Sequence, residues 1–195
     1  MRGLIAIVSV CVVVTFTAGC ASTPPSRFYT LTAATAPTAT SSDLSVIVGP
    51  VSVPAVVDRP EIVVSTGPNQ VRLDEFNRWA APLQNSIARV VAENLVVMLG
   101  APRVTLSQSL GADADYRAAI EVQSFESAPG EAAMLDAVWT VRRAKDGKSQ
   151  TGRTTVREVT QGKGYDALAA AHSRALARLS QNIADGVLAL ERSGQ

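Results

Sequence analysis

Aromatic residues and histidine are scarce in this sequence. Phe, Trp and Tyr make up 5% of its 195 residues, so a core has to be built mainly from the aliphatic side chains that bring the apolar fraction to 47%. Charge of one sign is also lacking, because 18 basic residues stand against 17 acidic ones. A chain without excess positive charge has no field that would hold a phosphate backbone, so we do not expect nucleic acid as a partner.

Long apolar runs and cysteines are equally few. One apolar run occupies residues 4–16, which is shorter than the roughly 20 residues that a transmembrane helix needs. Cys11 lies inside this run and Cys20 follows it. If the run is removed as part of a leader, we expect the mature chain to have no membrane-spanning segment and no disulfide within it.

The first twenty residues have the layout of a secretory leader. Arg2 supplies a positive charge, the apolar run follows, and Thr17-Ala18-Gly19 places small residues before Cys20. This ending resembles the lipobox of bacterial lipoproteins, although leucine is usual three residues before the cysteine. The resemblance implies that Cys20 is acylated. The alternative is a plain signal peptide cut near Ala18 or Ala21, with Cys20 incidental.

Acylation of Cys20 would give the protein a lasting membrane anchor. A lone thiol is a liability in an oxidising compartment, and diacylglyceryl and N-acyl modification would remove it. Because each buried methylene contributes about 0.8 kcal/mol, two or three chains hold far more firmly than one. Ala21 rather than Asp follows the cysteine, a pattern that directs lipoproteins of enteric bacteria to the outer membrane. We therefore expect residues 1–19 to be a signal peptide, the mature protein to lie at the periplasmic face of the outer membrane, and no cofactor beyond the acyl chains.

A tether is expected between Cys20 and the folded domain. Residues 21–26 are polar and contain proline, and at about 3.3–3.6 Å per residue they reach roughly 20 Å. Residues 27–31 are β-prone and predict an isolated strand that docks onto the domain, whereas residues 32–42 have too few apolar side chains to order themselves. We assign residues 20–43 to the tether and residues 44–193 to the domain.

Apolar periodicity predicts the elements of this domain. The Gly49-Pro50 step should bend the first strand, and the Asp146-Gly147 turn should join the last two. Helices are expected over residues 82–99, ended by Gly100, and over residues 165–190. Strands are expected over residues 45–53, 61–65, 71–73, 104–106, 116–125, 134–143 and 153–159.

The order of these elements predicts the α/β class. Each helix has a single apolar stripe, and two such helices can cover a sheet and build one core. We expect a mixed, largely antiparallel sheet packed with two long helices in a single-domain sandwich.

The sequence has few groups that could carry out catalysis. His172 neighbours a serine, but adjacent helix residues do not face each other, and its position on an apolar stripe favours packing. Gly147-Lys148-Ser149 resembles the end of a phosphate loop, but Arg142 stands where its first glycine is required. Asp113 and Asp115 fit a solvated loop better than a metal site. We therefore expect no enzymatic activity and no bound metal.

The segment Asn77-Arg78-Trp79 precedes the first predicted helix and is expected to be a loop. Tryptophan and arginine are favoured anchors in protein interfaces, which makes these three residues candidates for partner contact. In the structural alternative, Trp79 packs the entrance of the helix onto the sheet while Arg78 extends outward.

Four stretches follow the lipobox-like ending in a fixed order: RFYTL (27–31), VGPVSVP (48–54), DRPEIV (58–63) and NRWAAPL (77–83). In this order they resemble the PqiC/YmbA-type ABC-transport auxiliary lipoproteins. The resemblance implies an α/β sandwich and a non-enzymatic lipoprotein of the outer membrane. It also implies partners, namely an MCE-domain periplasmic protein and inner-membrane components that move lipids. Glu61 departs from the pattern, since relatives often have an amide there.

The residues and the resemblance together support two hypotheses about function. In the first, the anchored domain docks the end of a lipid-conducting partner through Asp58, Arg59, Asn77, Arg78 and Trp79. In the second, the domain itself carries a lipid or another apolar ligand in a groove beneath one helix. A third idea, an envelope hydrolase, would depend on His172. A homo-oligomer is compatible with each of them.

Overall fold

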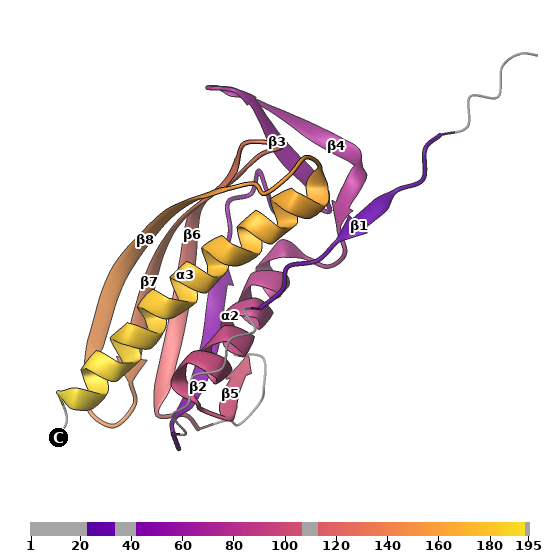
Figure 1. The fold of residues 1–195 in the computed structure, drawn as a ribbon. Helices are drawn as coiled ribbons and strands as arrows, with labels where there is room; N and C mark the ends of the chain where they lie inside the picture. The colour runs from indigo at the N-terminus through magenta and orange to yellow at the C-terminus, as the bar shows by residue number, and fades with distance from the viewer. Residues whose placement is uncertain (1–22, 34–41, 107–112, 194–195) are drawn as a thin grey trace, which may run out of the picture.

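Two helices lie side by side on one face of a curved sheet (Figure 1). This computed structural model describes residues 23–33, 42–106 and 113–193. The leader, Cys20 and residues 34–41 lie outside the described residues, so the signal peptide, the acylated cysteine and the exact extent of the tether stay predictions.

Every strand and helix expected from the sequence is present. The helices are α2 (Leu83–Leu99) and α3 (Tyr165–Arg192). The strands are β1 (Arg27–Tyr29), β2 (Ser45–Ser52), β3 (Glu61–Gly67), β4 (Gln70–Trp79), β5 (Arg103–Leu106), β6 (Tyr116–Ala128), β7 (Ala132–Arg143) and β8 (Ser149–Val159).

The strands form one mixed sheet, as predicted. Antiparallel pairing joins β3 to β4, β6 to β7 and β7 to β8. Parallel pairing joins β1 to β4 and places β2 between β5 and β6. Strand β2 is apolar and buried along most of its length. Its register with β6 shifts between Val48 and Val51, at the Gly49-Pro50 step.

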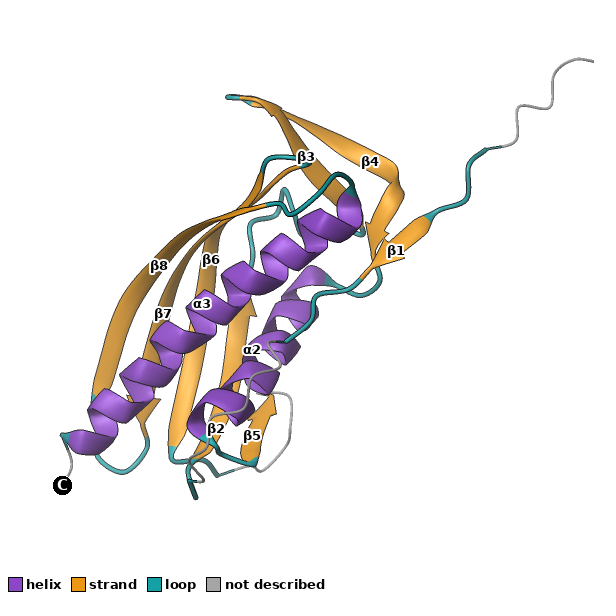
Figure 2. Ribbon diagram, in the orientation of Figure 1, coloured by secondary structure: helices purple, strands orange, loops and turns teal. Residues whose placement is uncertain are grey.

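Both helices cover the same face of the sheet (Figure 2). Helix α2 ends at Gly100, which has the left-handed φ of 59° that favours glycine. Helix α3 buries its apolar stripe against β6, β7 and β8. Between the helices the buried amide of Asn94 donates to the Ser180 hydroxyl over 3.1 Å. In the described part of the chain, neither helix has the length and apolar character needed to cross a bilayer.

The ring of Trp139 lies in a slot between a strand and a helix. Its Nε1 donates to Thr154 Oγ1 over 3.1 Å. A Cβ added at Gly152 of β8 would collide with the indole, and one added at Gly186 of α3 would come within 2.9 Å of it. The two glycines therefore make room for the tryptophan ring.

The segment before α2 is a strand and not the predicted loop. Strand β4 continues through Trp79, and its last residues pair in parallel with β1, Asn77 with Arg27 and Trp79 with Tyr29. The docked N-terminal strand supplies hydrogen-bond partners for the backbone of these residues. Local sequence does not reveal such a partner 50 residues away.

Candidate docking surface and anchor attachment

The described N-terminal segment is fastened to the fold at several points. Strand β1 pairs with β4, and the Tyr29 carbonyl accepts a hydrogen bond from the Ala80 amide over 2.9 Å. Leu31 is fully buried, and its carbonyl accepts from the Arg89 guanidinium over 2.7 Å. The Thr32 amide donates to Ser173 Oγ over 3.1 Å. We call residues 27–33 the anchor strap, because they connect the tether to β4 and to both helices.

A network of polar side chains connects the anchor strap to β4 and α3. The Tyr29 hydroxyl donates to Asn77 Oδ1 over 2.8 Å, and Asn77 Nδ2 donates to Asp74 Oδ1 over 2.9 Å. On the other side of the carboxylate, the Tyr165 hydroxyl of α3 donates to Asp74. The rings of Tyr29 and Tyr165 lie 5.8 Å apart. The network therefore ties β1, β4 and α3 together at the point where the tether meets the domain.

The protonation states in this network are fixed by its geometry. Partial burial acts to raise the pKa of Asp74, but the hydrogen bonds from Tyr165, from Asn77 and from two backbone amides outweigh it and lower the pKa. Burial, together with the Asp74 carboxylate, raises the pKa of Tyr165 to about 12. At neutral pH the carboxylate is thus a charged acceptor and the phenol a protonated donor.

Two of the predicted contact residues meet around Glu61. Arg78 forms an ion pair with the Glu61 carboxylate, and Arg59 Nε lies 3.8 Å from its other oxygen. A hydrogen bond from its own backbone amide lowers the pKa of Glu61, and Arg78 and Arg59 lower it further. Asp58 is exposed in the turn beside them. This side of the molecule therefore presents two arginines, held by one carboxylate, next to β1.

Asn77 and Trp79 lie elsewhere in the structure. Asn77 belongs to the network behind the strap and is half-buried. Trp79 is 6% exposed, and its ring packs edge-on against Phe125 and His172, with centroids 6.2 Å and 6.0 Å away. The burial of Trp79 fits the structural alternative, whereas the half-buried Arg78 lies in the ion pair with Glu61.

The single histidine is sealed in the core. His172 is fully buried, stacks on Phe125 with centroids 3.9 Å apart, and shares a 2.8 Å hydrogen bond between its Nε2 and Ser127 Oγ. Its Nδ1 has no hydrogen-bond partner among the described residues. Burial lowers the pKa of His172 to about 3, so the ring is neutral. Because Ser127 is 2% exposed, this serine and histidine cannot meet a substrate in the folded state.

The acidic residues near the start of β6 have a structural role. Asp115 accepts hydrogen bonds from the Ser45 hydroxyl over 2.6 Å and from the Ser45 amide over 2.9 Å. The hydroxyl contributes most to lowering the pKa of Asp115. Asp113 is exposed. Across residues 23–33, 42–106 and 113–193, no three His, Cys, Asp or Glu side chains gather closely enough to hold a metal ion.

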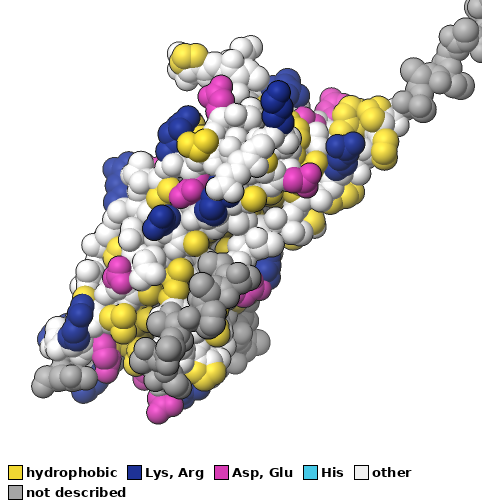
Figure 3. Space-filling view, in the orientation of Figure 1, with side chains coloured by type: hydrophobic (Ala, Val, Ile, Leu, Met, Phe, Trp, Pro, Cys, Tyr) yellow, Lys and Arg dark blue, Asp and Glu magenta, His cyan; other side chains and the backbone are white. Residues whose placement is uncertain are grey.

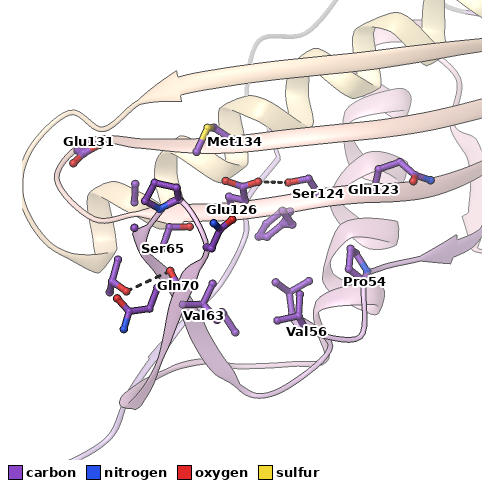
Figure 4. A pocket seen from close by; sticks show the side chains of 18 residues that line it. Pro54, Val56, Val63, Ser65, Gln70, Gln123, Ser124, Glu126, Glu131 and Met134 are labelled. Atoms are coloured by element: carbon purple, nitrogen blue, oxygen red, sulfur yellow. Dashed lines mark hydrogen bonds between the residues drawn. The ribbon is translucent and has the colours of Figure 1, made fainter.

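A groove that the sequence did not reveal lies between the β3–β4 hairpin and the strands β6 and β7 (Figure 4). Its volume is about 680 Å³. The apolar lining includes Pro54, Val56, Val63 and Met134, and Glu126 and Glu131 add two carboxyl groups. We call it the hairpin groove. It lies between strands and not beneath a helix, so it differs in place from the groove that the ligand-carrier hypothesis expected.

The hairpin groove exists because the hairpin diverges from the rest of the sheet. Strand β3 pairs with β6 at a single register position, Val64 with Ser127. A register shift in β6 between Val122 and Ser124 bends that strand beside the opening. Alternation of apolar residues predicts each strand separately, but it does not predict how far two strands remain paired.

Comparisons with known proteins identify relatives of the chain. The family profile described as "ABC-type transport auxiliary lipoprotein component" matches residues 29–184. A crystal structure of an uncharacterized protein, 22% identical, superposes with a TM-score of 0.69 and covers 84% of this chain and 99% of its own. Protein XCC0632 from Xanthomonas campestris, of family DUF330, is 19% identical with a TM-score of 0.67, covering 87% of this chain and 100% of its own. No curated protein matches the sequence.

Proposed function

We propose, because the chain belongs to the family of ABC-type transport auxiliary lipoprotein components, that it is a non-enzymatic part of a lipid transport system of the cell envelope. In this proposal an acylated Cys20 holds the domain at the periplasmic face of the outer membrane. The domain docks the end of a lipid-conducting MCE-domain partner, which inner-membrane components serve.

The anchor strap is the observation that carries this proposal. A tether attached to a loose segment would leave the domain free to turn in any direction, whereas residues 27–33 are fixed to β4, α2 and α3. With a tether of roughly 20 Å, the end of the fold around β1 stays close to the bilayer. Confinement of this kind turns docking into a local search at raised effective concentration.

The distribution of exposed apolar side chains supports the same orientation. Most of the large hydrophobic residues that remain exposed belong to β1, the β2–β3 loop, β4 and the end of β8. All of these segments lie at the end of the molecule where the tether leaves (Figure 1). The residues are Phe28, Val56, Val71, Leu73 and Val159. We take this end to be the one that faces the membrane and the partner.

A non-enzymatic role is consistent with the burial of the histidine and its serine partner. The serine and histidine that lie within hydrogen-bond distance, Ser127 and His172, are both buried. A hydrolase would need such a pair to open onto a cleft. Docking and positioning require no reactive group.

Membrane fractionation tests the anchor. Cys20→Ala should move the protein from the outer-membrane fraction to the soluble periplasm, because the acyl chains can no longer be attached. Cys11→Ala is the matched control, since that cysteine would leave with the leader and its loss should change nothing. Continued membrane association of a folded Cys20→Ala protein would disprove the lipid anchor.

Charge reversal tests the docking contacts. Arg59→Glu and Arg78→Glu should reduce the amount of MCE-domain partner recovered by crosslinking. Arg178→Glu on α3 is the control, because Arg178 is exposed and its nearest carboxylate, on Glu158, is 3.9 Å away. If both variants fold and recover the partner as the wild type does, these arginines are not the contacts.

The hairpin groove is the observation that favours a second candidate function, carriage of an apolar ligand. Its volume of about 680 Å³ lies within the range of small-molecule sites. Native mass spectrometry of the lipoprotein would detect a co-purified lipid. A bound lipid that is lost on Val56→Asp, a change at an exposed side chain of the lining, would favour carriage over docking.

A further inference from the structure

We propose that the hairpin groove binds an extended protein segment in which an apolar side chain stands next to a lysine or arginine. The inference deepens the proposed docking role and rests on it, since it states the chemistry of the segment that is docked. It starts from the shape, the lining and the charge of the groove.

The shape favours an extended chain. The groove runs between the β3–β4 hairpin and the strands β6 and β7 (Figure 4), and β3 pairs with β6 at only one register position, Val64 with Ser127. Ser65, Gln70 and Gln123 line it with hydroxyl and amide groups. Such groups can pair with the peptide units of an extended segment, which a lipid chain does not possess.

The lining provides a place for an apolar side chain. Val56 is 52% exposed, and Pro54, Val63 and Met134 surround the same space. Methionine adapts its shape to different partners. Covering these side chains with an apolar anchor would remove exposed hydrocarbon from water, which is the main favourable contribution in most protein association.

The charge of the groove selects a basic segment. Glu126 and Glu131 are exposed, and neither forms an ion pair within the described residues. The Glu126 carboxylate is oriented by a 2.8 Å hydrogen bond from Ser124. No lysine or arginine is among the described residues that line the groove. A cation from a partner therefore meets two carboxylates and no competing positive charge.

The same charges disfavour a phospholipid as the occupant. A phosphate headgroup would bring its negative charge beside Glu126 and Glu131, where like charges repel. A groove open between a hairpin and a sheet also leaves part of an acyl chain in water. A basic protein segment satisfies both the apolar and the acidic parts of the lining.

Fluorescence anisotropy with two labelled hexapeptides tests the inference. The full lipoprotein is placed in phosphatidylcholine nanodiscs, and empty nanodiscs serve as the blank. The probes are Lys-Leu-Lys-Val-Lys-Leu and Glu-Leu-Glu-Val-Glu-Leu, which share their apolar residues. The basic peptide should bind about tenfold more tightly than the acidic one, and the difference should shrink at high salt.

Variants assign the binding to the groove. The double variant Glu126→Gln and Glu131→Gln should weaken binding of the basic peptide about fivefold to tenfold. Val56→Asn should also weaken its binding, because the change removes part of the apolar lining. Glu75→Gln is the matched control, because Glu75 is exposed on β4 and does not line the groove. It should leave binding unchanged.

Several results would overturn the inference. Equal binding of both peptides, or full binding by the Glu126 and Glu131 double variant, would show that the carboxylates do not select the ligand. Saturable binding of dihexanoylphosphatidylglycerol that displaces the peptide would make the groove a lipid site. Self-association in sedimentation that the double variant abolishes would make it an interface between two copies.

The outcomes also separate this inference from the proposed function. Loss of the anchor in Cys20→Ala does not change the groove, so peptide binding can persist when the anchor hypothesis fails. Conversely, if the basic peptide does not bind, the inference about the groove fails, whereas the docking role is still tested by the fractionation and by the arginine variants.

Discussion

The half of the molecule formed by β6, β7, β8 and α3 differs sharply from the end formed by β1, β3 and β4. In the first, long antiparallel strands stay in register under the helix, and Trp139 is enclosed by two glycines. In the second, β3 leaves the sheet after one pairing with β6, and apolar side chains remain exposed. Figure 3 shows charged and apolar groups interspersed on the face seen from the helix side. The difference indicates that the packed half provides most of the stability, and it leaves the diverging end as the surface to which we assign the proposed docking.

The largest expected effect comes from adding one methyl group to the packed half. Gly152→Ala would push a Cβ into the Trp139 ring, and we expect the free energy of unfolding to fall by about 3 kcal/mol, because overfilling a dense core forces side chains and backbone apart. Urea denaturation followed by tryptophan fluorescence measures it.

The matched substitution at the diverging end is Gly67→Ala. The nearest atom to its new Cβ would be 3.9 Å away, on Gln70, so we expect a change of less than about 0.5 kcal/mol. Equal losses for the two glycines would remove the contrast between the regions.

The anchor strap should give the next largest effect. Leu31 is fully buried and Phe28 is 64% exposed. Leu31→Ala should lower the free energy of unfolding by about 2 to 3 kcal/mol through the cavity that it leaves, and Phe28→Ala by less than about 0.5 kcal/mol. Chemical denaturation of both variants checks this. A Leu31→Ala protein as stable as Phe28→Ala would mean that the strap is only loosely attached.

Acid should weaken the packed half through His172. Burial holds its pKa at about 3 in the folded state, while the unfolded chain takes up the proton near pH 6.5. Above pH 6.5 the histidine is neutral in both the folded and the unfolded state and does not reduce stability. As the pH falls toward 3, the unfolded chain binds a proton that the folded protein does not, so the free energy of unfolding falls, by about 2 kcal/mol between pH 6 and pH 4.

Replacement of the histidine isolates this effect. His172→Phe keeps an aromatic ring against Phe125 but cannot titrate, so its stability should fall less steeply than that of the wild type from pH 6 to pH 4. The lowered pKa values of Glu61, ordinarily 4.5, and of Asp74 and Asp115, ordinarily 3.8, add acid sensitivity near and below those values, and both proteins share it. Thermal unfolding at a series of pH values compares the two proteins, and identical slopes would show that His172 is not the titrating group.

The sequence was informative wherever local pattern decides the structure. The apolar stripe of α3 and the Asp146-Gly147 turn predicted the C-terminal half, and Gly100 predicted the end of α2. These predictions succeed because caps, turns and periodicity act over a few residues. The buried position of His172 followed from the same periodicity. The family followed from the order of the motifs, and the matching profile confirms it.

Long-range pairing set the limit of prediction. Asn77 and Trp79 were expected in a loop because nothing near them in the sequence shows that β1 pairs with them. The hairpin groove was missed for a related reason, since it depends on how few residues β3 shares with β6. The roles of Asp58, Arg59 and Arg78 stay predictions, and the structure adds that the two arginines share Glu61.

The parallel pairing of β1 with β4 determines how the molecule bears mechanical load. The described tether residues leave the fold at the start of β1 (Figure 1), so if Cys20 carries the proposed anchor, tension on it would pull along that strand. Its hydrogen bonds would then be sheared together, while the buried side chain of Leu31 and the bond to Ser173 resist the same movement. A short strand attached in this way holds the tether to the domain by several bonds that must break at once.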